Sequence, residues 1–161
     1  MLRPVRADDA DRLTEILREP EVARWWGPWD VERVRKEMLD DPETVVYAIE
    51  TDGQMIGLIQ YWEESDPNFR HAGIDIALAT ARQDQGYGSE AVRVLARYLL
   101  EERGHHRLTI DPAVANERAV RAYERVGFRP VGVMREYSRG PDGEWHDGLL
   151  MDLLASESRR A

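Results

Sequence analysis

The spacing of apolar residues predicts two helices near the start of the chain. Apolar positions at intervals of three and four predict a first helix that begins after Asp8 and ends before Pro20. The tryptophan-rich segment that follows is interpreted as a loop. Asp30 is a suitable N-cap for a second helix, which should end at Asp40-Asp41-Pro42.

The next apolar runs are of the β type. Runs at 45–49 and 55–62 flank Thr51-Asp52-Gly53, where Asp-Gly supplies the positive φ angle that a tight hairpin needs. We therefore expect these two strands to be antiparallel neighbours. After a polar connection, a third strand at 73–78 leads directly into a glycine loop at 83–88.

The second half of the chain alternates helices and strands. The expected elements are a helix that ends at Gly104, a strand at 107–110, a helix from Asn116 to Gly127, and two strands at 129–138 and 145–153. This order predicts a mixed α/β fold with one central sheet. We expect a single domain over residues 1–155, followed by a disordered tail over residues 156–161.

Composition narrows the class of protein. The chain has 161 residues, of which 42% are hydrophobic and 33% charged, as in globular proteins. No stretch approaches the roughly 20 apolar residues that span a bilayer, and residues 1–9 lack the apolar run of a signal peptide. We therefore expect no membrane segment and a cytoplasmic location.

The net charge and the scarcity of metal-ligand residues argue against several kinds of partner and site. A formal charge of -9 disfavours nucleic acid as a partner and would attract a cationic substrate, although such a charge can also serve only solubility. The chain has no cysteine, which excludes thiolate zinc sites and cysteine nucleophiles. Its four histidines show no ligand spacing, so we predict no metal.

The glycine loop is the first candidate ligand-binding site. Gly86 and Gly88 stand where a strand passes into a helix, and a helix start presents unpaired N–H groups and the positive end of the helix dipole. A pyrophosphate can bind there, although glycines can also serve only a tight turn. Neither a Walker loop nor a dinucleotide fingerprint fits the spacing.

Two ordered motifs then indicate a family. Gln83-Asp84-Gln85-Gly86-Tyr87-Gly88 resembles the Gln/Arg-x-x-Gly-x-Gly/Ala signature of the GNAT superfamily of acyl-CoA N-acyltransferases. The segment from Asn116 to Phe128 is similar to the second marker of that family. The resemblance implies a mostly antiparallel sheet that is splayed at the cofactor site and flanked by helices, with acetyl-CoA as the co-substrate.

The resemblance also implies roles for particular residues. The pyrophosphate would lie along Gln83, Gln85, Gly86, Tyr87, Gly88 and Ser89. The pantetheine arm would pair with the backbone of Ile76 and Leu78 and contact Asn116, and Tyr123 would lie near the thioester sulfur. From the residues alone, Asn116 can equally be a helix N-cap and Tyr123 a core aromatic.

Within the superfamily, the chain most resembles aminoglycoside 6′-N-acetyltransferases. The resemblance rests on Arg24-Trp25-Trp26-Gly27, Trp62-Glu63-Glu64-Ser65-Asp66-Pro67, Gly73-Ile74-Asp75 and Ile110-Asp111-Pro112. It implies a cationic aminoglycoside as the acceptor, with the 6′-amine as its reacting group. Enzymes of the siderophore type share part of the pattern, particularly the paired tryptophans.

Amine acetylation needs a base, because the reacting amine must be neutral. Asp75 is the best candidate, since it interrupts an apolar strand that leads to the glycine loop, although alternation would also allow it on a solvated face. Asp111 ends the next strand and can hold the substrate ammonium, or it can be a turn residue before Pro112.

The tryptophans are the remaining candidates for the acceptor site. Trp25 or Trp26 can form a wall against a sugar ring or a cation, while core packing is the alternative for at least one tryptophan of this segment. The acidic residues between 63 and 66 are interpreted as solvated surface. We expect direct acetyl transfer with Asp75 as base and Tyr123 as acid.

Three alternatives remain open at this point. The acceptor can be another small molecule, such as a siderophore hydroxylamine, or the amino group of a protein. The chain can also bind acetyl-CoA as a sensed ligand without transferring the acetyl group. The oligomeric state is not predicted by the sequence.

Overall fold

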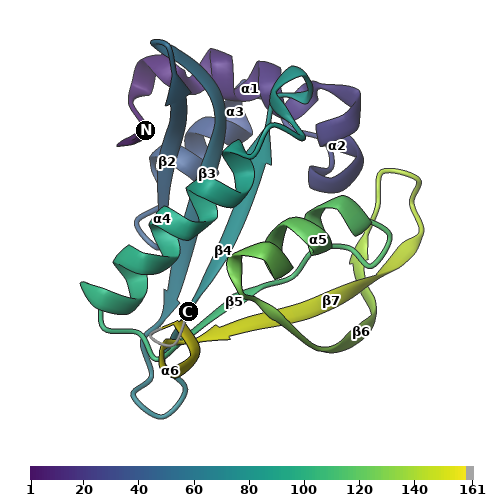
Figure 1. Cartoon of the computed structure of the whole chain (residues 1–161). Helices are drawn as coiled ribbons and strands as arrows, with labels where there is room; N and C mark the ends of the chain where they lie inside the picture. The colour runs from purple at the N-terminus through teal and green to yellow at the C-terminus, as the bar shows by residue number, and fades with distance from the viewer. Residues whose placement is uncertain (159–161) are drawn as a thin grey trace.

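Residues 1–158 are described by a computed structural model (Figure 1). Within them, seven strands form one sheet in the order β1-β2-β3-β4-β5-β7-β6. All neighbouring strands are antiparallel except β4 and β5. The strands are β1 (Leu2–Pro4), β2 (Thr44–Thr51), β3 (Gln54–Glu64), β4 (His71–Leu78), β5 (Arg107–Ile110), β6 (Arg129–Arg139) and β7 (Trp145–Leu154).

Helices flank the sheet as predicted. They are α1 (Ala10–Arg18), α2 (Pro20–Trp26), α3 (Val31–Val34), α4 (Tyr87–Glu101), α5 (Glu117–Val126) and α6 (Ala155–Ser158), with short 3-10 helices η1 (Ala7–Asp9) and η3 (Thr80–Arg82) and a π-helical turn η2 (Arg35–Leu39) that continues α3. Among residues 1–158, none of these helices has both the length and the apolar character needed to cross a bilayer.

The strand alternation creates a core on each side of the sheet. Ile59 and Ile74 point to the face covered by α4, where they pack with Leu95. Leu58 and its cross-strand partner Ala77 point to the opposite face, which packs against α1 and α3. Burial on both faces explains why β3 is a nearly continuous apolar run.

The sheet opens between β4 and β5. These parallel strands pair only at Ala72 with Leu108 and at Gly73 with Thr109. Pro112 follows β5, and its carbonyl accepts a hydrogen bond of 2.8 Å from the N–H of Leu149 on β7. The chain after β5 therefore follows β7, and Figure 1 shows this half of the sheet diverging from β4 with α5 packed beside it. The predicted splayed sheet is confirmed.

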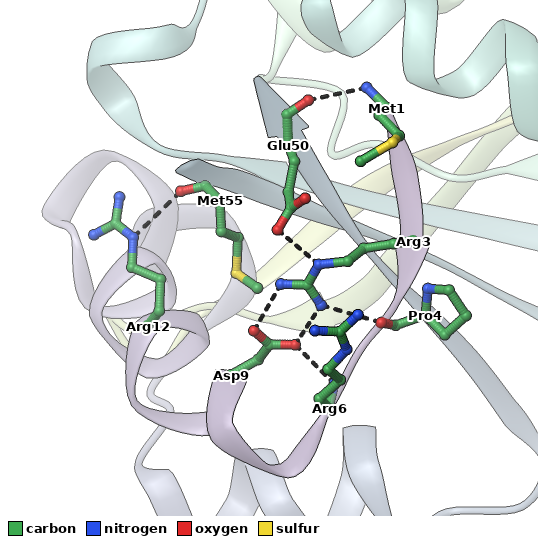
Figure 2. A network of polar contacts seen from close by, with 8 residues as sticks. All are labelled: Met1, Arg3, Pro4, Arg6, Asp9, Arg12, Glu50 and Met55. Carbon is green, nitrogen blue, oxygen red and sulfur yellow. Dashed lines mark hydrogen bonds and ion pairs between the residues drawn. The ribbon is translucent and has the colours of Figure 1, made fainter. Parts of the chain in front are cut away.

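An arginine fork fastens the N-terminal strand, which the sequence analysis did not predict. Arg3 Nε lies 2.6 Å from Glu50 Oε1, and Arg3 Nη1 lies 2.7 Å from Asp9 Oδ2 (Figure 2). The three side chains are only 13–18% exposed. This fork joins β1 to β2 and to the turn that begins α1, on the side of the sheet remote from β5.

Two expectations from the sequence, on residues 24–29 and on the C-terminal tail, differ from the structure. The segment interpreted as a tryptophan-rich loop is mostly helical, because α2 includes Trp25 and Trp26. Pro20 is its first residue, a position where the fixed φ angle of proline suits a helix. The predicted tail begins as the short helix α6, and its residues 159–161 lie outside the described residues.

Candidate functional site

The edge of β4 that faces the opening presents free backbone donors. Ala79 N–H bonds to Ile56 O on β3, so by strand alternation the backbone groups of Ile76 and Leu78 face the other edge. Ile76 O accepts from Trp26 Nε1 at 3.3 Å, and Leu78 O accepts from Gln83 Nε2 at 3.0 Å. At this edge the two carbonyls are already engaged, whereas the two N–H groups lie beyond the last β4–β5 pair, have no acceptor within residues 1–158, and can donate to a ligand.

The glycine loop ends at the N-terminus of α4, as the sequence predicts. Gly86 is the N-cap with a φ angle of 88°, a left-handed conformation that glycine adopts without strain. Glu90 N–H makes the first helical hydrogen bond, to Gly86 O. Within residues 1–158, no carbonyl or side chain accepts from the N–H groups of residues 87–89. These donors can hold an anion such as a pyrophosphate.

A cavity of about 230 Å³ lies against this helix start and is called here the cofactor cavity. Most of the predicted cofactor residues line it, namely Ile76, Leu78, Gln83, Gly86, Gly88, Ser89, Asn116 and Tyr123. Gln85 and Tyr87 do not: Gln85 Nε2 donates to Ala81 O, and Tyr87 packs against the core. Arg118 and Arg125, which were not predicted, also line it together with the acidic Glu21 and Asp84, and Arg118 Nη1 lies 3.6 Å from Asp84 Oδ2.

Helix α5 forms the wall opposite β4. Asn116 is its N-cap, with Oδ1 accepting from Ala119 N–H at 3.3 Å, so the interpretation as a cap is correct. The side chain also lines the cofactor cavity, where its amide N–H₂ group can still contact a ligand. Burial is the main cause that raises the pKa of Tyr123, and the charges of Asp75 and Asp111 add to it. The phenol therefore keeps its proton at neutral pH.

A second cavity, the acceptor cavity, continues from the first and has a volume of about 330 Å³. It shares Trp25, Trp26, Ile76, Asn116 and Tyr123 with the cofactor cavity. Asp75 from β4 and Asp111, which directly follows β5, both line it where the two strands diverge, and the charge of Asp111 acts on Asp75. The opening of the sheet thus brings together both carboxylates that the sequence analysis selected.

The protonation of Asp75 is set by its surroundings. Burial raises its pKa to about 6, the charge of Asp111 adds to this rise, and a hydrogen bond from Gln60 opposes it. Gln60 lies directly opposite Asp75 in the β3–β4 ladder. A carboxylate with a pKa near 6 suits a base that works at neutral pH, because it is ionised yet still binds a proton readily.

Asp111 is positioned by a residue that the sequence did not reveal. Tyr137 Oη donates to Asp111 Oδ2 at 2.6 Å, and this bond partly opposes the rise that burial causes in the pKa of Asp111. A β-bulge between Met134 and Ser138 turns Tyr137 toward the opening. Only the register of β6 against β7 brings these residues together, so no local sequence signal could have found the contact.

The tryptophans of α2 close one side of both cavities. Trp25 and Trp26 are half-buried and line the cofactor and the acceptor cavity alike. Arg24 stacks on Trp25, with its guanidinium carbon 4.6 Å from the ring centre. Trp26 is fixed through its indole N–H to Ile76 O, and Trp29 packs beside it at 6.2 Å between ring centres. Trp26 is thus the more firmly held of the pair.

Comparison with known proteins identifies the family. Residues 1–129 match the family described as "Acetyltransferase (GNAT) domain". Together with the splayed sheet and the free donors at α4, this match shows that the chain belongs to the GNAT acetyltransferase family. The family predicted from the two sequence motifs is confirmed.

Individual relatives include enzymes for cationic amines. The chain is 30% identical to aminoglycoside N(6′)-acetyltransferase type 1 of Klebsiella pneumoniae, over 88% of this chain and 78% of that protein. A structure of aminoglycoside acetyltransferase AAC(6′)-Ib with coenzyme A and kanamycin aligns with a TM-score of 0.82 and 25% identity, over 100% of this chain and 98% of that one.

A second solved structure shares the fold alone. Spermidine N-acetyltransferase from Vibrio cholerae, in complex with CoA and spermine, aligns with a TM-score of 0.85 and 20% identity, over 99% of this chain and 97% of that one. Both aligned structures contain coenzyme A, in agreement with acetyl-CoA as the co-substrate predicted from the sequence.

Proposed function

We propose that this protein transfers an acetyl group from acetyl-CoA to a primary amine of an aminoglycoside, with the 6′-amine as the reacting group. The observation that carries the proposal is the pair Asp75 and Asp111, which line one cavity beside the N–H groups of β4 that face the opening. Two carboxylates in a half-buried cavity attract an ammonium group and can take a proton from it. The similarity to 6′-N-acetyltransferases favours an aminoglycoside as the carrier of that ammonium.

The cofactor would lie across the opening of the sheet. Its pyrophosphate would bind the N–H groups at the start of α4, and Arg118 would add positive charge from α5. The Ile76 N–H, which faces the opening, would donate to the thioester oxygen and stabilise the negative charge that develops there. Acetyl-CoA supplies the activated acetyl group, and the protein supplies its orientation.

Proton transfers at two side chains complete the reaction. Asp75 accepts one proton from the substrate ammonium, directly or through water, and the neutral nitrogen attacks the thioester carbon. As the C–S bond breaks, Tyr123 gives its phenolic proton to the sulfur. The phenolate then takes the second proton lost by the nitrogen, while Asp75 releases its proton to solvent. This sequence needs no covalent enzyme intermediate.

A linear polyamine is the second candidate acceptor. The carboxylates Asp75 and Asp111 would attract any ammonium group, and the fold aligns well with a spermidine acetyltransferase. Aminoglycosides and spermidine must therefore be compared directly in the same assay.

The test measures thiol release with kanamycin, amikacin, tobramycin and spermidine, followed by product mapping by NMR. Acetylation of the aminoglycosides at the 6′-nitrogen supports the proposal. Turnover of spermidine alone would indicate that the acceptor is a polyamine and not an aminoglycoside. Acetyl-CoA binding without turnover of any amine would leave only a ligand-binding role.

A further inference from the structure

A third cavity, of about 830 Å³, adjoins the acceptor cavity and is called here the outer cavity. The two cavities share four residues, Trp25, Trp26, Ala113 and Ser138. The rest of its lining comes from Arg24 and Gly27 at the end of α2, from Val114 and Ala115, and from the β6–β7 hairpin. A ligand whose reacting amine lies at Asp75 can therefore extend outward into this second space.

The outer cavity differs from the acceptor cavity in charge. Among residues 1–158, Asp75 and Asp111 are the only charged side chains that line the acceptor cavity, and both are acidic. In the outer cavity, Asp142 and Asp147 are balanced by Arg24 and Arg139. Asp142 is further engaged with His146, whose Nε2 lies 2.8 Å from Oδ2. The inner space thus favours an ammonium group, whereas the outer space gives a second cation no comparable attraction.

The outer cavity is instead rich in aromatic surface. Trp25 and Trp26 border it from α2, and Trp145 borders it from the start of β7. Trp145 is 59% exposed, and no aromatic pair or stacked cation involves it within residues 1–158. A large indole beside a cavity gains free energy when the apolar face of a ring covers it.

We propose that the outer cavity binds a second ring of the acceptor and that Trp145 packs against the face of this ring. Trp145 then favours multi-ring amines over linear polyamines, because a flexible chain offers no flat apolar face. The inference rests on the proposed function, since the acceptor must first place its ammonium between Asp75 and Asp111.

The experiment compares wild type with Trp145→Ala and Trp145→Phe, and uses Phe69→Ala as the control. Phe69 is also exposed, at 72%, but lines none of the three cavities. Thiol-release kinetics are measured with spermidine, with 6-amino-6-deoxyglucose as a single ring, and with kanamycin as a multi-ring acceptor. Calorimetric titration of kanamycin in the presence of CoA gives binding without turnover, and thermal melting verifies that each variant is folded.

For Trp145→Ala, we expect KM and Kd for kanamycin to rise roughly five- to tenfold, while KM for acetyl-CoA, spermidine and the single ring stays unchanged. Trp145→Phe should keep most of the kanamycin affinity, and Phe69→Ala all of it. An unchanged Kd for kanamycin, or an equal loss with every acceptor, would overturn the inference. If wild type binds kanamycin in a Trp145-dependent manner but releases no thiol, the proposed function fails and the ring-binding role stands.

Discussion

Gln60 donates a hydrogen bond from Nε2 to Oδ2 of Asp75, at 3.2 Å, from the directly opposite position in the β3–β4 ladder. The other end of its amide, Oε1, is buried and has no partner within residues 1–158. This bond favours the ionised carboxylate and holds down a pKa that burial raises to about 6. Gln60 is therefore a positioning residue for the proposed base.

Gln60→Leu should move the acid side of the pH–rate profile upward. Without the amide donor, the carboxylate binds its proton more tightly, and the apparent pKa in kcat/KM should rise from about 6 by roughly one unit. Acetyl-CoA affinity should not change. Gln54→Leu, at an exposed position of the same strand, serves as the control. An unshifted profile would remove Gln60 from this role.

Asp111→Asn should move the same profile in the opposite direction. The charge of Asp111 raises the pKa of Asp75, so its removal lowers that pKa and extends activity to lower pH. The variant should also raise KM for cationic acceptors, because one of the two attracting carboxylates is lost. An apparent pKa that moves to higher pH, or an unchanged KM for cationic acceptors, would contradict the electrostatic coupling of the pair.

Asp75→Asn tests the base directly. The amide cannot accept the proton, so kcat should fall by roughly 100- to 10,000-fold while KM for acetyl-CoA stays nearly constant. Asp11→Asn, at an exposed position of α1, is the matched control. Wild-type kcat in the Asp75 variant would exclude it from the mechanism.

Gly148 makes room for the ring of Tyr137. A Cβ atom at this position would lie 2.8 Å from Tyr137 Cδ1, so Gly148→Ala should displace the ring from Asp111. The same loss of the hydrogen bond follows in Tyr137→Phe, and in both variants the pKa of Asp111 should rise. KM for the acceptor should then increase more at pH 6 than at pH 8. Gly132→Ala, whose Cβ would meet no atom within 4 Å, should behave as wild type.

The fork at Arg3 predicts a stability effect far from the site. The hydrogen bond from Arg3 is the main cause that lowers the pKa of Asp9, so the ionised carboxylate stabilises the fold. This contribution is fully present above the ordinary pKa of about 4 and is lost as pH falls through the lowered value. Asp9→Asn should lower the free energy of unfolding at pH 7 by about 1–3 kcal/mol in urea titrations. The exposed Asp11→Asn variant should not.

The sequence predicted the strands β2 to β7 and the principal helices well, because their apolar periodicity reflects which face each one buries, but it did not predict β1. The hairpin at Asp52-Gly53 and the glycine loop at Gly86 were predictable for a different reason, since both need positive φ angles that few residues adopt. Helix α2 was missed although Pro20 at its first turn is a recognisable start signal. Strand β1 is only three residues long and depends on pairing with β2.

The site was predictable only in part. Asp75 and Asp111 were selected because they follow or interrupt apolar strands, and the opening of the sheet brings them together. Gln60 and Tyr137 were not selected, because their roles depend on strand register and on a bulge. Both are contacts between distant parts of the chain, and no local pattern encodes them.

The central claim is tested most directly with neomycin and paromomycin, two aminoglycosides that differ only by an amine or a hydroxyl at the 6′ position. Thiol-release kinetics with wild-type protein give kcat/KM for each. If the 6′-amine is the group acetylated, kcat/KM for neomycin should exceed that for paromomycin by at least roughly 100-fold, because a hydroxyl cannot take the place of the attacking nitrogen. Equal values for the two compounds, or no turnover of neomycin, would contradict the account.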